Sequence, residues 1–316
     1  MLTALHNIIT DRNTPAQANI LRRFADTYYA NAPVDELLAR PVADVYGATL
    51  SSWHFIQQRH PHEVKVRVFN PDHENHGWQS LHTVVEVVCE DVPFLVDSVR
   101  MQLNARQMSL HAIQYCVLHA TRDRDGHLQA ETDWRKPGKG KLPEAIIYIE
   151  FDHHSDKDVL QQLTESLHSV LEEVRCCVED FTAITRRADE VSQHLATVQV
   201  EGIAEALAFM RWLGGNHFTF LASDEFHFER EGDNEFVVRD GEQDLGTFRF
   251  HKKADRTRLK LQDLPADIHD FITGTSPVSF MKSGVRSRVH RPAYPDYVVV
   301  KRYNDAGEVI GGVRFM

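Results

Sequence analysis

The order of strand-like and helix-like patterns between residues 81 and 180 limits the possible folds of this chain more than any other feature. Segments with strand-like apolar patterns are 81–89, 110–120, 145–151 and a short stretch at 176–178. Apolar stripes at helical spacing lie between them, over 95–103 and from Asp156 to Val174. The resulting order is β-α-β-β-α-β, which predicts a ferredoxin-like antiparallel sheet with two helices on one face.

Helical patterns precede this unit and follow it. Thr14-Pro15-Ala16-Gln17 has the form of a capping box with proline at the first helical position, and a second helix is expected over 42–58. We therefore predict an N-terminal helical segment over residues 1–62. A strand at 64–69 opens the sheet-containing domain, 63–180, and a polar helical connector follows over 181–200.

Residues 201–316 are predicted to form a β-rich domain, which gives the chain an α+β fold class. Helices are expected at 202–213 and near 266–272. Expected strands are 218–228, 235–239, 247–251, 278–281, 297–304 and 309–316. The chain stops inside an apolar strand pattern, so the sequence predicts that this last domain is truncated.

Charge and composition restrict the partners. The chain holds 46 acidic against 35 basic residues, a formal net charge of -11, which disfavours nucleic acid and anionic lipid as partners. The N-terminus lacks a secretory signal, and no apolar run approaches the ~20 residues of a membrane span. Four cysteines without metal-site spacing are interpreted as buried thiols. We expect a cytoplasmic protein without a membrane partner.

Motifs for chemistry are absent from the sequence. A dinucleotide-binding turn (G-x-G-x-x-G), a phosphate loop and a G-x-S-x-G nucleophile motif do not occur, so we predict no catalytic and no cofactor-binding residues. The histidine groups at 60–62, 73–76 and 153–154 lack the converging ligands of a zinc site, so no metal is expected. A metalloenzyme built on these histidines is kept as an alternative.

Two segments resemble a known family. His82–Val99, HTVVEVVCEDVPFLVDSV, is similar to the first ACT-type domain of the large bacterial NAD-specific glutamate dehydrogenases. Trp212–Leu221, WLGGNHFTFL, together with 286–315, resembles the PAS-like region that follows in the same family. The chain departs from the family at Ala222-Ser223, where Gly-Tyr is common. It also lacks a glycine at 107–109, where amino-acid-binding ACT domains usually carry one.

The resemblance implies a regulatory or assembly segment of an enzyme that converts L-glutamate, NAD and water to 2-oxoglutarate, ammonia and NADH. The catalytic domain, with its NAD site, would lie beyond this fragment, which we predict to be inactive alone. Implied partners are the chain's own C-terminal catalytic domain, further copies in a homo-oligomer, and an amino-acid effector. A free-standing ACT/PAS amino-acid sensor that controls another protein is the alternative.

An effector site is implied by position in the ACT-type domain, where small ligands bind between the first strand-helix loop and the start of the second strand. The residues so placed are Asp91, Val92, Phe94, Asp97, Ser98, Met108 and Ser109. Backbone N–H groups at a helix start bind carboxylates well. A glycine in this turn normally lets the backbone approach the ligand closely, and residues 107–109 contain none. A role of this domain in assembly is therefore at least as plausible as a role in ligand sensing. The basic stretch 282–291 is interpreted as a solvated strand edge or a contact within an oligomer.

Overall fold

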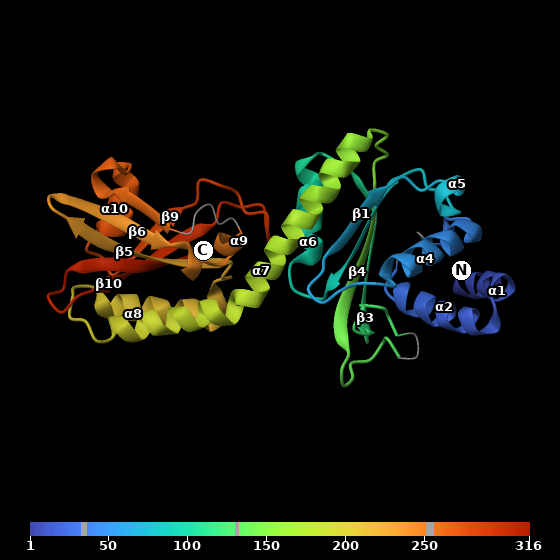
Figure 1. Ribbon diagram of the computed structural model, residues 1–316, viewed down its shortest axis with the longest axis horizontal. Coiled ribbons are helices and arrows are strands. Elements are labelled where there is room, and N and C mark those ends of the chain that lie inside the picture. The colour runs from blue at the N-terminus through green and yellow to red at the C-terminus, as the bar shows by residue number, and fades with distance from the viewer. Residues whose placement is uncertain (33–36, 130–132, 251–255) are drawn as a thin grey trace. The chain divides into compact units, whose positions relative to one another are not determined.

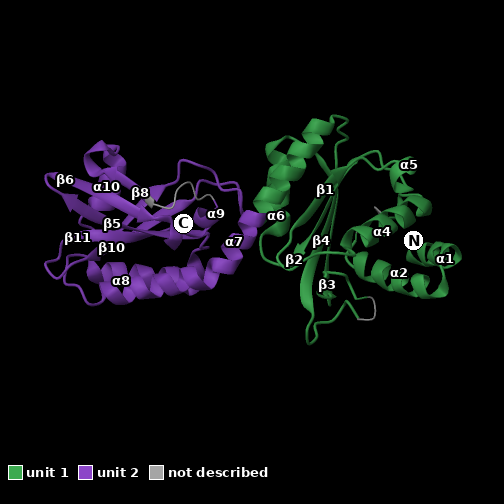
Figure 2. Cartoon of the chain, in the orientation of Figure 1, with its two compact units in different colours: residues 1–171 green, residues 172–316 purple. Residues whose placement is uncertain are grey.

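The computed structural model describes residues 1–32, 37–129, 133–250 and 256–316. The chain divides into two compact units, residues 1–171 (unit 1) and 172–316 (unit 2), which are described separately here (Figure 2). Both units combine helices with an antiparallel sheet, so the predicted α+β class is confirmed. No helix in the described part of the chain is both long and apolar enough to cross a membrane.

Unit 1 is built around a four-stranded sheet with strand order β1-β2-β4-β3. Its strands are β1 (Lys65–Phe69), β2 (Thr83–Glu90), β3 (Leu110–Ala120) and β4 (Leu142–Phe151). Its helices are α1 (Leu2–Arg12), α2 (Pro15–Tyr28), α4 (Val42–Ile56), the short α5 (His73–His76), α6 (Leu95–Ala105) and the first part of α7 (Lys157–Leu195). The four strands β1 to β4 therefore lie within a few residues of the strands predicted at 64–69, 81–89, 110–120 and 145–151.

Helices cover both faces of this sheet. The α1, α2 and α4 helices pack on one face, where their apolar residues join Val84, Val88 and Ile146 in one core (Figure 1). The α6 helix and the first half of α7 lie on the other face (Figure 1). Seven of the eight residues of β2 are buried, as expected of a strand whose two faces are both covered.

The predicted strand at 176–178 is wrong, and with it the last strand of the βαββαβ order. Residues 176–178 lie inside α7, because Cys177 continues the apolar stripe of Val170 and Val174 at helical spacing. The position expected for that strand, beside β2, is held by β1, which pairs antiparallel with it from Lys65 opposite Val88 to Phe69 opposite Val84. After the N-terminal helices, and apart from the short α5, the observed order in unit 1 is ββαββα.

The N-terminal helices belong to the same compact unit as the sheet. The predicted capping box is confirmed at the start of α2, where Thr14 and Gln17 cap each other's backbone groups. The α1 helix was not predicted. It contributes the fully buried Leu5 and Ile9 to the core shared with the sheet. Each such aliphatic side chain stabilises the fold by about 1.5–3 kcal/mol.

Unit 2 contains a seven-stranded sheet of order β8-β6-β5-β11-β10-β9, with β7 paired to β5. Its strands are β5 (Ala222–Glu231), β6 (Asn234–Asp240), β7 (Leu245–Gly246), β8 (Arg256–Lys260), β9 (Val278–Lys282), β10 (Asp296–Tyr303) and β11 (Val309–Phe315). Its helices are the second half of α7, α8 (Ile203–Trp212), the π-helical turn Leu213–His217, α9 (Thr247–Phe250) and α10 (Ala266–Thr273), with 3-10 turns at Gly241–Gln243 and Leu261–Asp263.

The two faces of the unit 2 sheet carry separate cores. The second half of α7 and α8 pack on one face against Val298, Val300 and Phe315, and α10 packs on the other against Val299 (Figure 1). The strand predicted at 247–251 is wrong over 247–250, which form α9, and residue 251 lies outside the described residues. Just before α9, Gly246 adopts φ 63°, where a Cβ would lie 2.1 Å from the carbonyl oxygen of Leu221.

Candidate functional site

The first part of the predicted effector site surrounds the start of α6. Phe94 adopts φ 75° at the N-cap, which turns the chain from β2 into the helix. Asp97 is exposed in the first helical turn, and Ser98 is buried behind it. The side chain of Asp91 accepts a hydrogen bond from the hydroxyl of Tyr115 on β3. Burial, followed by this bond, raises the pKa of Tyr115 above its ordinary value.

The second part lies where the chain enters β3. Met108 is buried, and the backbone N–H of Ser109 donates to the carboxylate of Asp152 at 3.1 Å. The same carboxylate pairs with the ring of His111 at 2.8 Å, and these bonds lower the pKa of Asp152. The rings of His111 and His82 stack at 4.0 Å. Burial and then the neighbouring His111 lower the pKa of His82.

These two parts lie at opposite ends of the unit 1 sheet. Glu90, at the end of β2, lies opposite Glu144, whereas Thr83 at the other end lies opposite Phe151, which also adjoins Leu110. The length of β2 between the two ends is roughly 23 Å at about 3.3 Å per residue. One chain therefore does not bring Asp91 and Ser109 into one pocket. The seven-residue effector site stays a prediction, and it would need a second copy of the chain.

Buried carboxylates were missed by the sequence analysis. Glu144 is 3% exposed and accepts hydrogen bonds from Arg59 at 2.8 Å and from Arg122 at 2.7 Å. Burial alone would raise the pKa of Glu144, but the two guanidinium groups outweigh it and lower the pKa. The one feature of the sequence that could have indicated this buried carboxylate is the position of Glu144 directly before the apolar run of the predicted strand 145–151.

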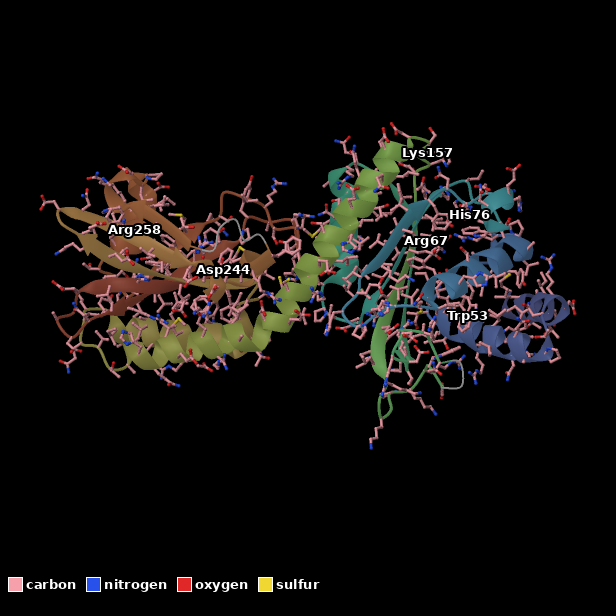
Figure 3. The ribbon with its side chains drawn as sticks, in the orientation of Figure 1. Trp53, Arg67, His76, Lys157, Asp244 and Arg258 are labelled. Atoms are coloured by element: carbon pink, nitrogen blue, oxygen red, sulfur yellow. The ribbon has the colours of Figure 1, made fainter. Side chains whose placement is uncertain are left out.

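Two further carboxylates tie the N-terminal helices to the sheet. Glu86, in the middle of β2, is bonded to Ser52 of α4 and to Arg67 of β1, which Figure 3 labels in unit 1. Its pKa is raised because burial outweighs the attraction of Arg67. Glu150 on β4 pairs with Arg40 at 2.5 Å. Each of these carboxylates has an arginine partner, so the pairs are best explained as structural.

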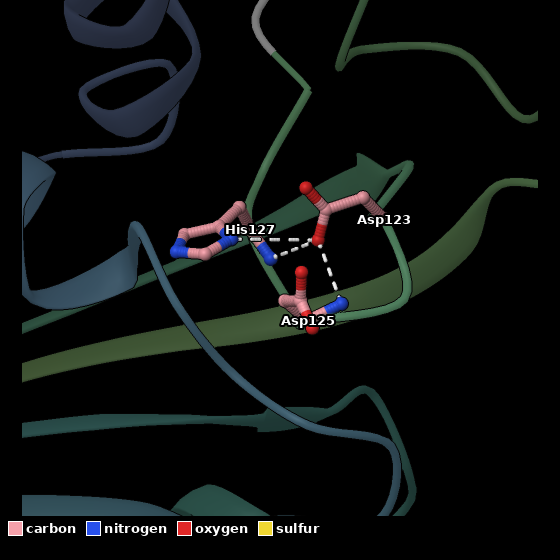
Figure 4. Close-up of side chains that lie close together, drawn as sticks. All are labelled: Asp123, Asp125 and His127. Atoms are coloured by element: carbon pink, nitrogen blue, oxygen red, sulfur yellow. Dashed lines mark hydrogen bonds and ion pairs between the residues drawn. The ribbon is translucent and has the colours of Figure 1, made fainter.

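One exposed group has metal-ligating side chains within 4.8 Å of one another: Asp123, Asp125 and His127 (Figure 4). The carboxylate of Asp123 accepts the backbone N–H groups of Asp125 at 3.0 Å and of His127 at 2.9 Å. These bonds, that of His127 first, lower the pKa of Asp123. These hydrogen bonds hold a tight turn, and the turn alone explains the cluster.

Two hollows of unit 2 lie along β9, one toward each end of the strand. The first, of about 930 Å³, is called the acidic hollow because its lining includes Glu201, Glu205, Glu235 and Glu308. The second, of about 710 Å³, is called the basic hollow because its lining includes Lys282, Arg291, His217 and His290, with Asp296 as its one acidic residue. Phe209 and Phe280 line both hollows and so separate them.

A separate ion cluster lies on the α10 side of the unit 2 sheet. Asp224 is 1% exposed and pairs with Arg314 and, at 3.2 Å, with Arg239. Arg239 also reaches Asp244 at 3.1 Å, and Figure 3 labels Asp244 in this unit. An apolar hollow of about 210 Å³ adjoins the cluster. Because carboxylates and guanidinium groups are equal in number, the cluster neutralises itself.

Comparison with known proteins gives this α+β architecture a family. Residues 24–167 match the family model described as "Glutamate dehydrogenase, ACT1 domain". The chain is 39% identical over 321 residues to the NAD-specific glutamate dehydrogenase of Halomonas elongata, a match that covers 100% of this chain and 20% of that protein. It is 38% identical over 320 residues to the NAD-specific glutamate dehydrogenase of Pseudomonas aeruginosa, covering 99% and 19%.

Most of unit 1 therefore matches an ACT-type domain, as expected from His82–Val99. The chain carries a glutamate dehydrogenase ACT1 domain, and its predicted resemblance to the NAD-specific glutamate dehydrogenase family is confirmed. The chain spans about a fifth of the length of the curated relatives that it matches.

Proposed function

We propose that this chain is a regulatory and assembly segment of a longer NAD-dependent glutamate dehydrogenase, and that it contains no catalytic domain. The observation that carries the proposal is the match of the whole chain to about a fifth of each of two NAD-specific glutamate dehydrogenases. The sequence contains none of the motifs for NAD binding, which agrees with a catalytic domain elsewhere.

The longer protein would convert L-glutamate, NAD and water to 2-oxoglutarate, ammonia and NADH in the cytoplasm. Its NAD site would belong to the catalytic domain, which is also the first partner proposed for this chain. Residues 201–316 would form the PAS-like domain that the sequence suggested. The antiparallel sheet of unit 2, with helices on both faces, supports that proposal.

Glutamate-dependent formation of NADH tests this function. The 316-residue chain, mixed with NAD and L-glutamate, should form no NADH, while the Pseudomonas aeruginosa relative under the same conditions should form it. Turnover by a sample of the chain that contains no other dehydrogenase would contradict the proposal. A longer natural protein that contains this chain, and that also lacks glutamate-dependent activity, would contradict it equally.

An amino-acid effector at the start of α6 is the regulatory part of this proposal. The backbone N–H groups of the first turn of α6 support it, because the carboxylate of an amino acid binds favourably at a helix N-terminus. The exposed carboxylate of Asp97 supports it as well, because it can pair with the ammonium group of the same ligand. Calorimetry with a panel of amino acids should give saturable heat that Asp97→Ala reduces and Asp125→Ala leaves unchanged. Absence of heat for the whole panel would leave assembly as the role of this domain.

A further inference from the structure

The two edge strands of the unit 2 sheet differ in how they are protected. On β8, Arg258 pairs with Glu229 at 3.2 Å and Glu231 at 2.7 Å and lies 3.5 Å from the ring centre of Phe236. Charged side chains of this kind discourage pairing with another strand. The β9 edge, with sequence VSFMK, has a single charged side chain, Lys282, at its end.

The backbone of β9 is oriented for pairing on its outer side. The N–H of Ser283 donates to Pro295, and the N–H of Lys301 donates to Pro277. Odd-numbered residues of β9 therefore face β10, and the backbone groups of Phe280 and Lys282 point away from it. In the sheet formed by the described residues, β9 is the last strand on that side.

An aromatic ridge, formed by Phe209, Trp212 and Phe280, stands beside this edge. Phe280 is 62% exposed and Trp212 is 50% exposed. Phe209 joins them, because its ring centre lies 5.0 Å from that of Phe280 and 5.8 Å from that of Trp212. Large aromatic side chains that remain exposed together are typical of the centre of a protein interface.

Charges are distributed unequally along β9. The acidic hollow lies at its N-terminal half, where Pro277 and Val278 join Glu201 and Glu205 in the lining, and no Lys, Arg or His is among the described lining residues. The basic hollow lies at its C-terminal half, with Lys282. Two copies of β9 that ran antiparallel about Phe280 would place each acidic half against the partner's basic half.

We propose that β9 and the aromatic ridge form the contact of a two-fold symmetric dimer of this chain. The two copies of β9 pair antiparallel, the two ridges pack against each other, and Lys282 faces the partner's acidic hollow beside Glu205. The contact is isologous, since each copy supplies the same surface. Lys282, at the start of the basic stretch 282–291, is thereby assigned to an oligomer contact. This inference deepens the assembly role proposed above and rests on it.

Sedimentation velocity of the 316-residue chain over a concentration series tests the dimer. We expect reversible dimerisation that Phe280→Glu weakens about tenfold or more, because it places a charge at the centre of an apolar contact. Leu259→Glu is the matched control, since Leu259 is 49% exposed on the opposite edge strand β8. It should leave the dimer unchanged. Circular dichroism verifies that both variants are folded.

Reversal of charges tests the arrangement of the two copies. Lys282→Glu and Glu205→Lys should each weaken the dimer, and the double variant should regain most of the affinity because the attraction across the interface is restored. Recovery by the double variant supports the antiparallel contact. The antiparallel contact is overturned if the loss of dimer affinity in the double variant equals the two single losses combined.

Two other results would also overturn the proposal. One is a chain that stays monomeric throughout the series, and the other is a dimer whose affinity does not respond to Phe280→Glu. In the second case the two copies associate through a surface other than β9. Neither result bears on the assignment to a glutamate dehydrogenase, which depends on NADH formation by the longer protein, so the two proposals fail separately.

Discussion

The two units of this chain use charge and surface differently. Both units cover the two faces of their sheet and pair a buried carboxylate with arginines, but the hollow found in unit 1 beside Gln114 and Tyr148 has a volume of only about 20 Å³. Unit 2 has hollows of about 930 and 710 Å³ on either side of exposed aromatic rings. We infer that unit 1 is built as a rigid scaffold and unit 2 as a contact surface.

One buried charge of unit 2 differs from the paired carboxylates of both units. Glu144 of unit 1 has two arginine partners. Lys301 of unit 2 is 0% exposed, and its Nζ donates to the backbone carbonyl of Phe271, with no carboxylate pairing with it among the described residues. Burial lowers the pKa of Lys301 to about 8. Removal of the charge should therefore lower the stability of the fold at Glu144 and raise it at Lys301.

Removal of the carboxylate of Glu144 should have the largest effect. Glu144→Ala leaves Arg59, which is 1% exposed, without its partner, and such a buried charge costs about 3–5 kcal/mol of stability. Urea unfolding in a Trp212→Phe background measures it, because Trp53, Trp78 and Trp134 all lie in unit 1. Glu229→Ala on the exposed Arg258 pair is the control and should change stability far less, because water screens an exposed ion pair.

The same variant has an expected pH dependence. Since the folded pKa of Glu144 is lowered, its contribution to stability is complete above the ordinary value of 4.5 and is lost as the pH falls through the folded pKa. Glu144→Ala should therefore lose less stability than the wild type on acidification. Equal acid sensitivity of the two proteins would show that the arginine pairs contribute little.

Tight packing in unit 1 should make Gly47→Ala the next most damaging change. A Cβ at Gly47 of α4 would lie 2.3 Å from the Cβ of the buried Trp78, so one of the two segments must move. Overpacking of this kind costs about 1–3 kcal/mol. Gly214→Ala in unit 2, where nothing lies within 4 Å, is the control. Similar melting temperatures for both variants would contradict the contrast between the units.

Lys301→Met should instead stabilise unit 2, by about 1–2 kcal/mol at neutral pH, because it removes a buried charge that lacks a carboxylate partner. Between pH 8 and 10.5 the folded chain releases a proton that the unfolded chain retains, so wild-type stability should rise with pH in that window. Unfolding measured at several pH values should show this rise in the wild type and not in Lys301→Met. A destabilised variant would mean that the bond to Phe271 outweighs the cost of burial.

The smallest effect is expected at the exposed turn of Figure 4. Asp123→Ala removes the acceptor for two backbone N–H groups and should lower the melting temperature slightly. Zinc or calcium should not change the melting temperature of the wild type, because the turn is held by its own hydrogen bonds. A metal-dependent increase that Asp123→Ala abolishes would refute the structural interpretation.

Sequence patterns predicted the fold where local and tertiary preferences agree. The alternation over 110–120 gives a strand, and Thr14 with Gln17 gives a helix start, because each pattern is satisfied by its own neighbours. They failed at 176–178, where β-prone residues are carried by a helix whose apolar stripe continues past them. Closure of the sheet by β1 was missed because strand pairing depends on contacts between distant segments.

The candidate site was less predictable for the same reason. In ACT-type domains, small ligands bind between the first strand-helix loop and the start of the second strand, which suggested one effector site for Asp91 and Ser109. The strand register instead places these two residues at opposite ends of the sheet. The arginine partners of Glu144 on β4 are Arg59, which follows α4, and Arg122, which follows β3, and no spacing in the sequence indicates these pairs. The basic stretch at 282–291 could be recognised in the sequence, whereas the acidic hollow is lined by several segments that lie far apart in the sequence, between Val200 and Val309.

Amide hydrogen exchange of the 316-residue chain, compared between dilute and concentrated samples, tests the contrast between scaffold and contact surface most directly. The account predicts that protection increases in the peptide that covers β9, where the backbone N–H groups of Phe280 and Lys282 become paired, and in α8 around Phe209 and Trp212. Unit 1 should exchange equally in both samples. Protection gained at the start of α6 in unit 1, with none gained in β9, would contradict the account.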